Sequence, residues 1–313
     1  MSMQNLISDP VSMTSCRQEA YLLRLRRQFP FVYVKTLTRT AFGRSVYALQ
    51  FGSGSRKLLI TAGHHANETI TSDAVWQWLF TFCNALLDGR TVCGAEAREL
   101  YHNAMVYLVP LVNPDGADLA AGVCASGSPE YRAAADIAAQ YPDIPFPSGW
   151  KANLRGVDLN LNYPARWEAA RRIKKAQGVS TPAPRDFAGF SPLDQPETAA
   201  LAAFTRCIHP ELMLALHTQG SVIYPGPEET APPGAHALAQ AFSDASGYPS
   251  LCRRNRPMRA SRTGFCRYSS GPRSRSRPVL AKTRCPPRSC RRSRAPSARF
   301  LPPRCSGKIS RKP

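Results

Sequence analysis

A nearly continuous apolar run at residues 104–112 limits the possible folds more than any other feature of this sequence. Its letters, AMVYLVPLV, contain no charged side chain, which is typical of a strand covered on both faces. Residues 212–217, LMLALH, form a second run of this kind. Strands buried on both faces need helices on both sides of their sheet, so the chain is expected to form a layered α/β domain.

Helical and extended patterns alternate around these two runs. Apolar residues at helical spacing in 69–87 predict a long helix, and β-rich runs separated by Gly and Ser predict short strands. We expect a single domain with a mixed, mostly parallel sheet flanked by helices. The other predicted helices are 17–29, 196–208 and 235–245, the other strands are 31–36, 45–51 and 57–61, and the Pro- and Gly-containing stretch 122–148 is predicted to be a surface excursion.

Charge divides the chain near residue 250. Of its 41 Lys and Arg, 20 lie in residues 251–313, which contain no Asp or Glu, so the first 250 residues hold 21 basic and all 21 acidic side chains. That first part is neutral, which argues against a nucleic-acid or membrane partner despite the net charge of +20. We expect an incomplete catalytic domain over 1–250 and a disordered, basic Arg/Ser/Pro/Cys-rich tail over 251–313.

Cysteine usage and the N-terminal residues predict a cytoplasmic location. No CxxC pair occurs among the 10 cysteines, so isolated thiols in a reducing compartment are expected rather than disulfides or a cysteine zinc site. No apolar run reaches the ~18 residues that span a bilayer, and the first residues do not have the pattern of an export signal.

Two histidines and a glutamate have the arrangement of a metal site. His65 and Glu68 form an H-x-x-E motif where a predicted strand ends and a helix begins, and their side chains suit zinc. That motif alone occurs often by chance. His217 ends the apolar run 212–217 and would point from the carboxyl edge of the sheet. For this residue taken alone, a buried core histidine is the better explanation.

Two further segments change this balance. NPDG at 113–116 follows one predicted strand, and GVDLNLNY at 156–163 follows Trp150-Lys151. With H-x-x-E before them and the strand-borne histidine after them, the chain resembles the zinc carboxypeptidases of the carboxypeptidase A-like family over about residues 17–250. The segments WKAN, GVDLN and LHTQG are most similar to those of the bacterial γ-D-glutamyl-L-diamino acid (meso-diaminopimelate) endopeptidases.

The resemblance implies a zinc-dependent metallopeptidase that hydrolyses an amide bond of murein-derived stem peptides with a zinc-activated water. It assigns the ligands of one Zn²⁺ to His65, Glu68 and His217, and the carboxylate that orients the first histidine to Asp158. Substrate-binding roles fall to Asn160 and Tyr163. The family's oxyanion-stabilising arginine corresponds to Lys151, with Arg155 as a nearby substitute, and the sequence leaves both open.

One departure from the family pattern bears on specificity. Enzymes of this family that remove a single C-terminal residue have Asn-Arg after GVD-x, and this pair grips the terminal carboxylate. Here Asn160 is kept, but Leu161 replaces the arginine. The loss of a bidentate clamp argues against ordinary C-terminal exopeptidase specificity.

A second departure concerns the general base, a glutamate near the C-terminus of these enzymes. No Asp or Glu follows Asp244. However, codons chosen among synonyms for RPVLAKTRCP at 277–286, read one base earlier, translate as EAGLGENPLP, which matches the family's segment around that glutamate. We therefore interpret the tail as an out-of-frame translation and expect the chain as written to be inactive.

Three other functions stay open at this point. The chain could be a metallocarboxypeptidase acting on other peptides, a catalytically inactive zinc-binding or peptide-binding protein, or, with a genuine basic tail, a nucleic-acid binder. Zinc content separates the last from the others. Cleavage of a murein tripeptide separates the predicted function from all three.

Overall fold

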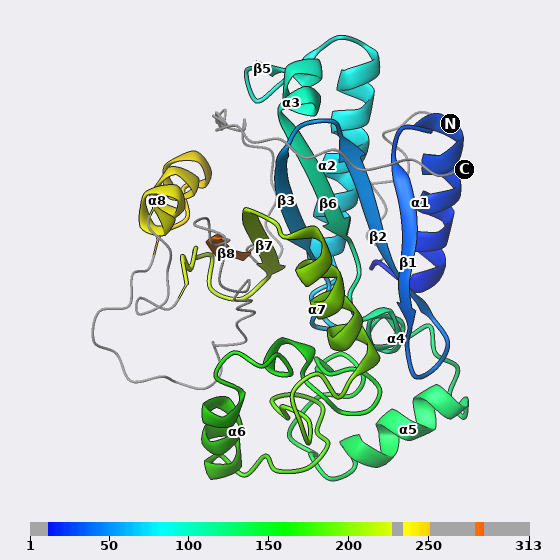
Figure 1. Cartoon of the computed structure of the whole chain (residues 1–313). Coiled ribbons are helices and arrows are strands. Elements are labelled where there is room, and N and C mark those ends of the chain that lie inside the picture. Colours follow the sequence, from blue (N-terminus) through cyan, green and yellow to red (C-terminus); the bar gives the residue numbers. More distant parts are fainter. Residues whose placement is uncertain (1–11, 227–233, 251–278, 285–313) are drawn as a thin grey trace.

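A six-stranded mixed sheet lies at the centre of the molecule, with strand order β1–β2–β6–β3–β7–β8 (Figure 1). This computed structural model describes residues 12–226, 234–250 and 279–284. The strands of the sheet are β1 (Tyr33–Arg39), β2 (Ser45–Gly52), β3 (Arg56–Thr61), β6 (Ala104–Val109), β7 (Leu212–His217) and β8 (Val279–Arg284).

Strand direction changes across the sheet. β1, β2 and β6 pair antiparallel, whereas β6, β3, β7 and β8 pair parallel. The predicted mixed, mostly parallel sheet is therefore confirmed. The parallel strands β3 and β7 are neighbours in register, with Thr61 opposite Ala215, although the sequence between them contains most of the other elements.

Helices cover both faces of the sheet, as the two apolar runs require. On one face, α1 (Ser15–Gln28) and α2 (Ile70–Leu87) pack against Leu49 and Phe51 of β2. On the other, α7 (Pro196–Ile208) contributes Leu201 to a second core that includes Val46. The alternation of β2 side chains between the two cores follows from the two-residue period of a strand.

Several helices begin where the sequence analysis predicted none. The stretch 122–148, predicted to be a surface excursion, contains α5 (Pro129–Ala138), whose first turn is capped by Ser128. The surface excursion therefore includes a helix that was not predicted, because a serine cap followed by proline at the first position starts a helix. The remaining short elements are β4 (Thr91–Val92), β5 (Ala95–Glu96), α3 (Ala97–Asn103), α4 (Pro114–Ala120), η2 (Leu159–Leu161) and α6 (Trp167–Ala176).

The C-terminal part of the described chain holds α8 (Ala235–Ser246) and β8. We predicted no regular element beyond residue 250, and β8 differs from that expectation because it pairs in parallel with β7 along Leu212–His217. The rest of the predicted tail lies outside the described residues.

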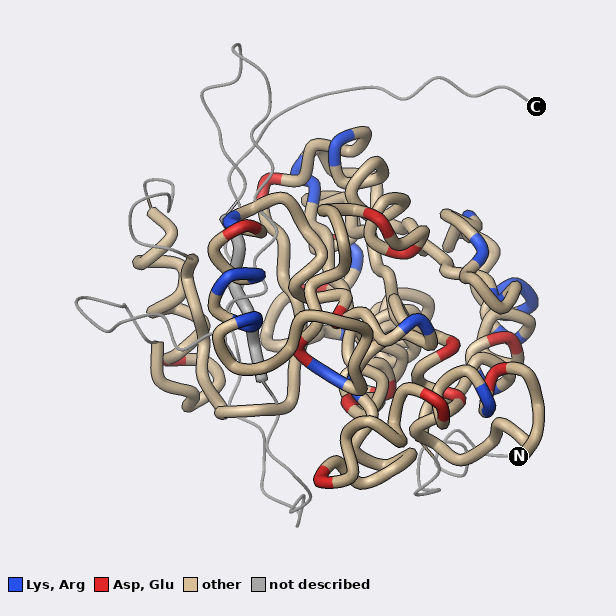
Figure 2. Tube along the Cα trace, turned by 90° about the horizontal axis from the view of Figure 1, so that it is seen from below, with Lys and Arg blue, Asp and Glu red and all other residues tan. Residues whose placement is uncertain are grey.

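Three further observations complete the fold. Along the described trace, basic and acidic positions are interspersed (Figure 2). No described helix is long and apolar enough to cross a membrane. The cysteines that the structure describes have free thiols, namely Cys16, Cys83, Cys93, Cys124 and Cys207.

Candidate metal centre

The turn between β3 and α2 presents His65 and Glu68 on the same side. Gly63 begins the turn at φ 63°, a conformation that favours glycine, and an added Cβ would lie 2.7 Å from the side chains of both Leu111 and Ser72. The Glu68 amide then donates to the His65 carbonyl at 3.1 Å. This single turn explains why two side chains three positions apart converge.

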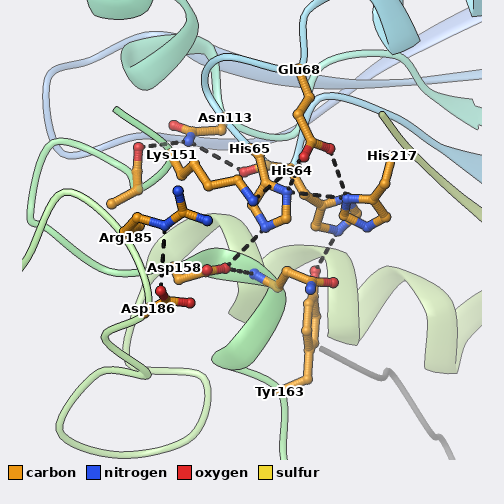
Figure 3. Close-up of polar contacts among 12 residues, drawn as sticks. His64, His65, Glu68, Asn113, Lys151, Asp158, Tyr163, Arg185, Asp186 and His217 are labelled. Atoms are coloured by element: carbon orange, nitrogen blue, oxygen red, sulfur yellow. Dashed lines mark hydrogen bonds and ion pairs between the residues drawn. The ribbon is translucent and has the colours of Figure 1, made fainter. Parts of the chain in front are cut away.

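His217 reaches the same place from β7, of which it is the last residue. Because β3 and β7 are adjacent and parallel, their carboxyl ends lie at one edge of the sheet. Figure 3 shows His217 and Glu68 turned toward His65 at this edge. Residues separated by about half the chain are thus brought together by a single strand pairing.

The three side chains form a compact donor set. The Nδ1 atoms of His65 and His217 lie 3.2 Å apart, and each lies 3.0 Å from an oxygen of Glu68. All three residues are buried. A tetrahedral ion with bonds of about 2.0–2.1 Å holds its ligands about 3.3 Å apart, so these donors fit a single zinc ion.

Electrostatics in the centre favour a cation. Burial raises the pKa of Glu68, but the charges and hydrogen bonds of His65 and His217 outweigh burial and hold that pKa well below its usual range. Burial likewise lowers the pKa of His65, and the carboxylates of Glu68 and Asp158 outweigh it and raise the pKa. Glu68 is therefore ionised and available as a ligand.

Asp158 lies on the far edge of the His65 ring. Its Oδ1 is 3.2 Å from His65 Nε2 and accepts from the Asn160 amide at 3.1 Å, where it caps η2. Burial raises the pKa of Asp158, but His65 and Lys151 outweigh burial and the pKa is lowered. The ionised carboxylate is placed to hold the proton of His65 on Nε2, which leaves Nδ1 as the ligand atom.

The two oxyanion candidates are placed differently. Lys151 is buried, with Nζ 3.6 Å from Glu68 Oε1, whereas Arg155 is exposed. The Arg155 amide donates to Asn153 Oδ1 at 3.1 Å and fixes the loop. The structure thus brings Lys151 to the ligands and leaves the Arg155 side chain at the surface.

The expected substrate residues follow Asp158. The Tyr163 hydroxyl lies 3.1 Å from His64 Nε2, beside the ligands, and Asn160 is half-buried. Leu161 turns away into a small cluster with Trp167 and Ala188. The position to which the resemblance assigns a carboxylate-gripping arginine is therefore filled by an apolar side chain that packs against the protein itself.

No role follows from the sequence motifs for two groups that lie at the centre. His64 is buried next to His65, and its place in the doubled histidine was the available signal. Arg185 and Asp186 lie beside Lys151 and Asp158 in Figure 3, and no motif pointed to them. Their position depends on contacts between loops.

Comparison with known proteins agrees with this geometry. A family model described as zinc carboxypeptidase matches residues 18–269. The γ-D-glutamyl-L-diamino acid endopeptidase 1 of Lysinibacillus sphaericus is 37% identical over 227 residues, which is 72% of this chain and 55% of that protein. The uncharacterized protein YqgT of Bacillus subtilis (strain 168) is 36% identical over 222 residues, covering 70% of this chain and 57% of that protein.

Solved structures share the fold at low sequence identity. Carboxypeptidase A from Helicoverpa armigera has a TM-score of 0.55 at 21% identity and covers 75% of this chain and 53% of its own. Thrombin activatable fibrinolysis inhibitor has a TM-score of 0.60 at 17% identity and covers 80% and 60%. The chain spans little more than half the length of the curated relatives it matches.

Proposed function

This chain belongs to the zinc carboxypeptidase family, and from that premise we propose that it is the zinc-binding and substrate-binding part of a peptidase for peptidoglycan stem peptides. The amide bond is of the γ-D-glutamyl-diaminopimelate type. One observation carries the proposal: His65, Glu68 and His217 converge within hydrogen-bond distance of one another, with Asp158 behind the first histidine.

Each residue of the centre has a distinct task in this proposal. His65, Glu68 and His217 hold the ion, which when bound supplies a Lewis acid for amide hydrolysis. Asp158 fixes the ring of His65. Lys151, whose ammonium group already lies at the ligands, is placed to stabilise negative charge that develops on the substrate carbonyl oxygen, a role for which the exposed Arg155 is less well placed.

The substrate class rests on two observations. A relative 37% identical is named for γ-D-glutamyl-diamino acid bonds. Leu161, buried in its apolar cluster, offers no charge to a C-terminal carboxylate at the place where exopeptidases of the family have arginine. A metallocarboxypeptidase acting on ordinary C-terminal residues is therefore the less favoured alternative.

The activity of the chain as written is a separate matter. Residues 245–313 contain no Asp or Glu, so this segment cannot supply a carboxylate to act as general base. We propose that the written chain binds zinc and peptide but hydrolyses the peptide only slowly. This observation favours, as a second candidate function, an inactive zinc-dependent peptide-binding protein.

The test compares two substrates on a protein whose reading frame is shifted upstream of Arg277. L-Ala-γ-D-Glu-diaminopimelate and a blocked dipeptide with an ordinary C-terminal residue are assayed at equal zinc loading. We expect faster cleavage of the murein tripeptide. Faster cleavage of the dipeptide would reject the proposed specificity, and zinc binding without cleavage of either would favour the inactive binding protein.

A further inference from the structure

Arg185 lies in a loop that is fixed against the metal centre from both sides. The amides of Lys151 and Ala152 donate to the Pro184 carbonyl at 2.8 and 2.9 Å, and the Asp158 amide donates to the Phe187 carbonyl at 2.8 Å. Arg185 and Asp186 are the two residues between these anchors. In the view of Figure 3 the Arg185 side chain is drawn next to Lys151 and Asp158, and its dashed contact goes to Asp186.

The ion pairs of the Arg185 loop involve two cations and one carboxylate. Lys174 Nζ lies 2.7 Å from Asp186 Oδ1, and Arg185 Nε lies 3.3 Å from Asp186 Oδ2. Among the described residues, the ion pairs of both cations go to this one carboxylate. Lys174 is almost fully buried, so the Lys174–Asp186 ion pair is the stronger of the two. The other carboxylate near this loop, Asp158, is held by His65. Arg185, the weaker partner of Asp186, is therefore the cation left for a ligand.

The exposure of these side chains determines which cation a ligand can reach. The Lys174 side chain is 2% exposed, whereas that of Arg185 is 36% exposed. The contact with Asp186 uses Nε, at one edge of the guanidinium. A guanidinium held at one edge keeps a second pair of N–H donors in the geometry that matches a carboxylate.

We propose that Arg185 binds a carboxylate of the peptide substrate and thereby determines specificity at this centre. This inference rests on the proposed peptidase function and deepens it. A γ-D-glutamyl-diamino acid peptide carries carboxylates on both sides of the scissile amide, namely the α-carboxylate of the glutamyl residue and a carboxylate of the diamino acid. Arg185 supplies the cation that Leu161 does not, from a different loop.

The other cations of the centre are engaged elsewhere. The Lys151 ammonium contacts Glu68, and Arg155 is exposed beyond the Asn153 loop, where its charge acts on Glu197. A purely local role for Arg185, as an ion-pair partner of Asp186, is the alternative. Such a partly exposed pair contributes little to stability and would affect all ligands equally.

The experiment measures binding by calorimetry to the zinc-loaded full chain. The ligands are L-Ala-γ-D-Glu-meso-diaminopimelate and two forms of it, one amidated at the glutamyl α-carboxylate and one at the carboxylates of the diamino acid. The variants are Arg185→Met, Arg185→Lys and, as a matched control, Arg172→Met, an exposed arginine on α6. Thermal unfolding of each variant checks that the fold is intact, and kcat/KM replaces Kd for any ligand that is cleaved.

We expect Arg185→Met to weaken the tripeptide Kd about 10- to 30-fold, as for loss of a charge-assisted hydrogen bond. Arg185→Lys should recover only part of this loss, and Arg172→Met should show none. The parent should bind one of the two amidated tripeptides with a Kd weakened by a similar factor. Arg185→Met should not weaken the binding of that ligand further. The position of its amide then identifies the carboxylate that Arg185 binds. Equal weakening of all three ligands, or of none, overturns the inference.

Failure of the proposed substrate has a different signature. If the parent binds no murein peptide, blocked dipeptides with a C-terminal carboxylate or amide are the second series. If Arg185→Met then weakens the binding of the dipeptide carboxylate but not of the dipeptide amide, the result would support a carboxylate-binding Arg185 and reject the murein substrate. If the parent binds neither series, or if the acid and amide respond alike, the inference is overturned.

Discussion

Glu68 and Asp158 approach the His65 ring from opposite edges. Glu68 faces Nδ1 at 3.0 Å, and Asp158 faces Nε2 at 3.2 Å. A neutral imidazole has one proton, and a carboxylate on Nε2 holds it there, so that Nδ1 is free to donate its lone pair to a metal. The two carboxylates therefore have different roles, although both are buried and both have a lowered pKa.

Substitution of Asp158 should weaken zinc binding without removing a ligand. We expect Asp158→Ala to lower zinc affinity about 10- to 100-fold, because the His65 ring loses the partner that fixes its tautomer and orientation. Competition with a chelator measures the affinity. Asp136→Ala, an exposed position on α5, is the matched control and should bind zinc as the parent does. Equal affinities for Asp158→Ala and the parent would remove Asp158 from the centre.

His217 belongs to the donor set itself, so its loss should be more severe. Purified His217→Ala is expected to retain little zinc after dialysis, because two remaining donors from one turn do not complete a tetrahedral site. His236→Ala, an exposed histidine on α8, is the control. The measurement is metal content per chain by atomic emission. Zinc in His217→Ala equal to that in His236→Ala would contradict the assignment.

Among the elements, α7 is joined to the loop of residues 153–157 through a buried polar contact. Glu197, near the start of α7, lies 3.5 Å from Asn153 Nδ2 through Oε1, and Asn153 Oδ1 accepts from the amides of Arg155 and Val157. Burial raises the pKa of Glu197 to about 7. This glutamate therefore changes charge near neutral pH, inside the structure that holds the 153–157 loop.

The raised pKa has a defined effect on stability. Because the folded pKa is above the ordinary value of 4.5, the stabilisation is fully present below pH 4.5 and is lost as the pH rises through about 7. We expect the parent to lose up to about 3 kcal/mol of unfolding free energy between pH 4.5 and pH 8 through this group. Glu197→Gln, which stays neutral, should have a flatter profile.

Urea unfolding at several pH values between 4.5 and 8 measures this difference. Glu168→Gln, at an exposed position on α6, is the control and should retain the slope of the parent. Asp73 has a pKa raised by burial to about 6 and contributes its own slope in every variant. Parallel profiles for Glu197→Gln and the parent would show that Glu197 does not titrate in this range.

Elements with strong internal patterns were predictable from the sequence, and elements fixed by distant contacts were not. The bounds of α7 and β7 agree with the prediction to the residue, because proline begins the helix and a left-handed His209 ends it before an apolar run. By contrast, α4 begins at the Asn113 side chain, which caps the Gly116 amide at 3.0 Å. Its seven residues are too few for a periodic pattern.

The centre shows the same division. The three proposed ligands follow from motifs in a familiar order, and their convergence needs the turn after β3 and the β3–β7 pairing. Arg185 could not be predicted, because its position depends on backbone hydrogen bonds between residues 184–187 and residues 151–158. No pattern within either segment encodes that contact.

For the whole molecule, we expect the segment after residue 250 to decide between hydrolysis of a peptide and binding alone. We expect the written chain to show hydrolysis of the murein tripeptide lowered at least about 10²- to 10⁴-fold relative to the frame-shifted protein, which is the usual contribution of a positioned general base. We also expect lower soluble yield, because an Arg/Ser/Pro-rich segment buries little apolar surface.

Both proteins are expressed side by side, and soluble yield, zinc content and tripeptide hydrolysis are measured for each. Zinc binding in both with hydrolysis in only one is the expected pattern. Comparable hydrolysis by the two would show that another group acts as base and that the tail is native.

The parallel contact between β3 and β7 also sets when the metal can be acquired. His65 and Glu68 leave the ribosome about 150 residues before His217, and two donors alone make a weak site. The third donor arrives only after β7 has been synthesised and has paired with β3, a contact of long sequence separation that forms slowly. We therefore expect zinc uptake to be a late event in biogenesis, and the rate at which a refolding chain captures the ion to report on closure of the sheet.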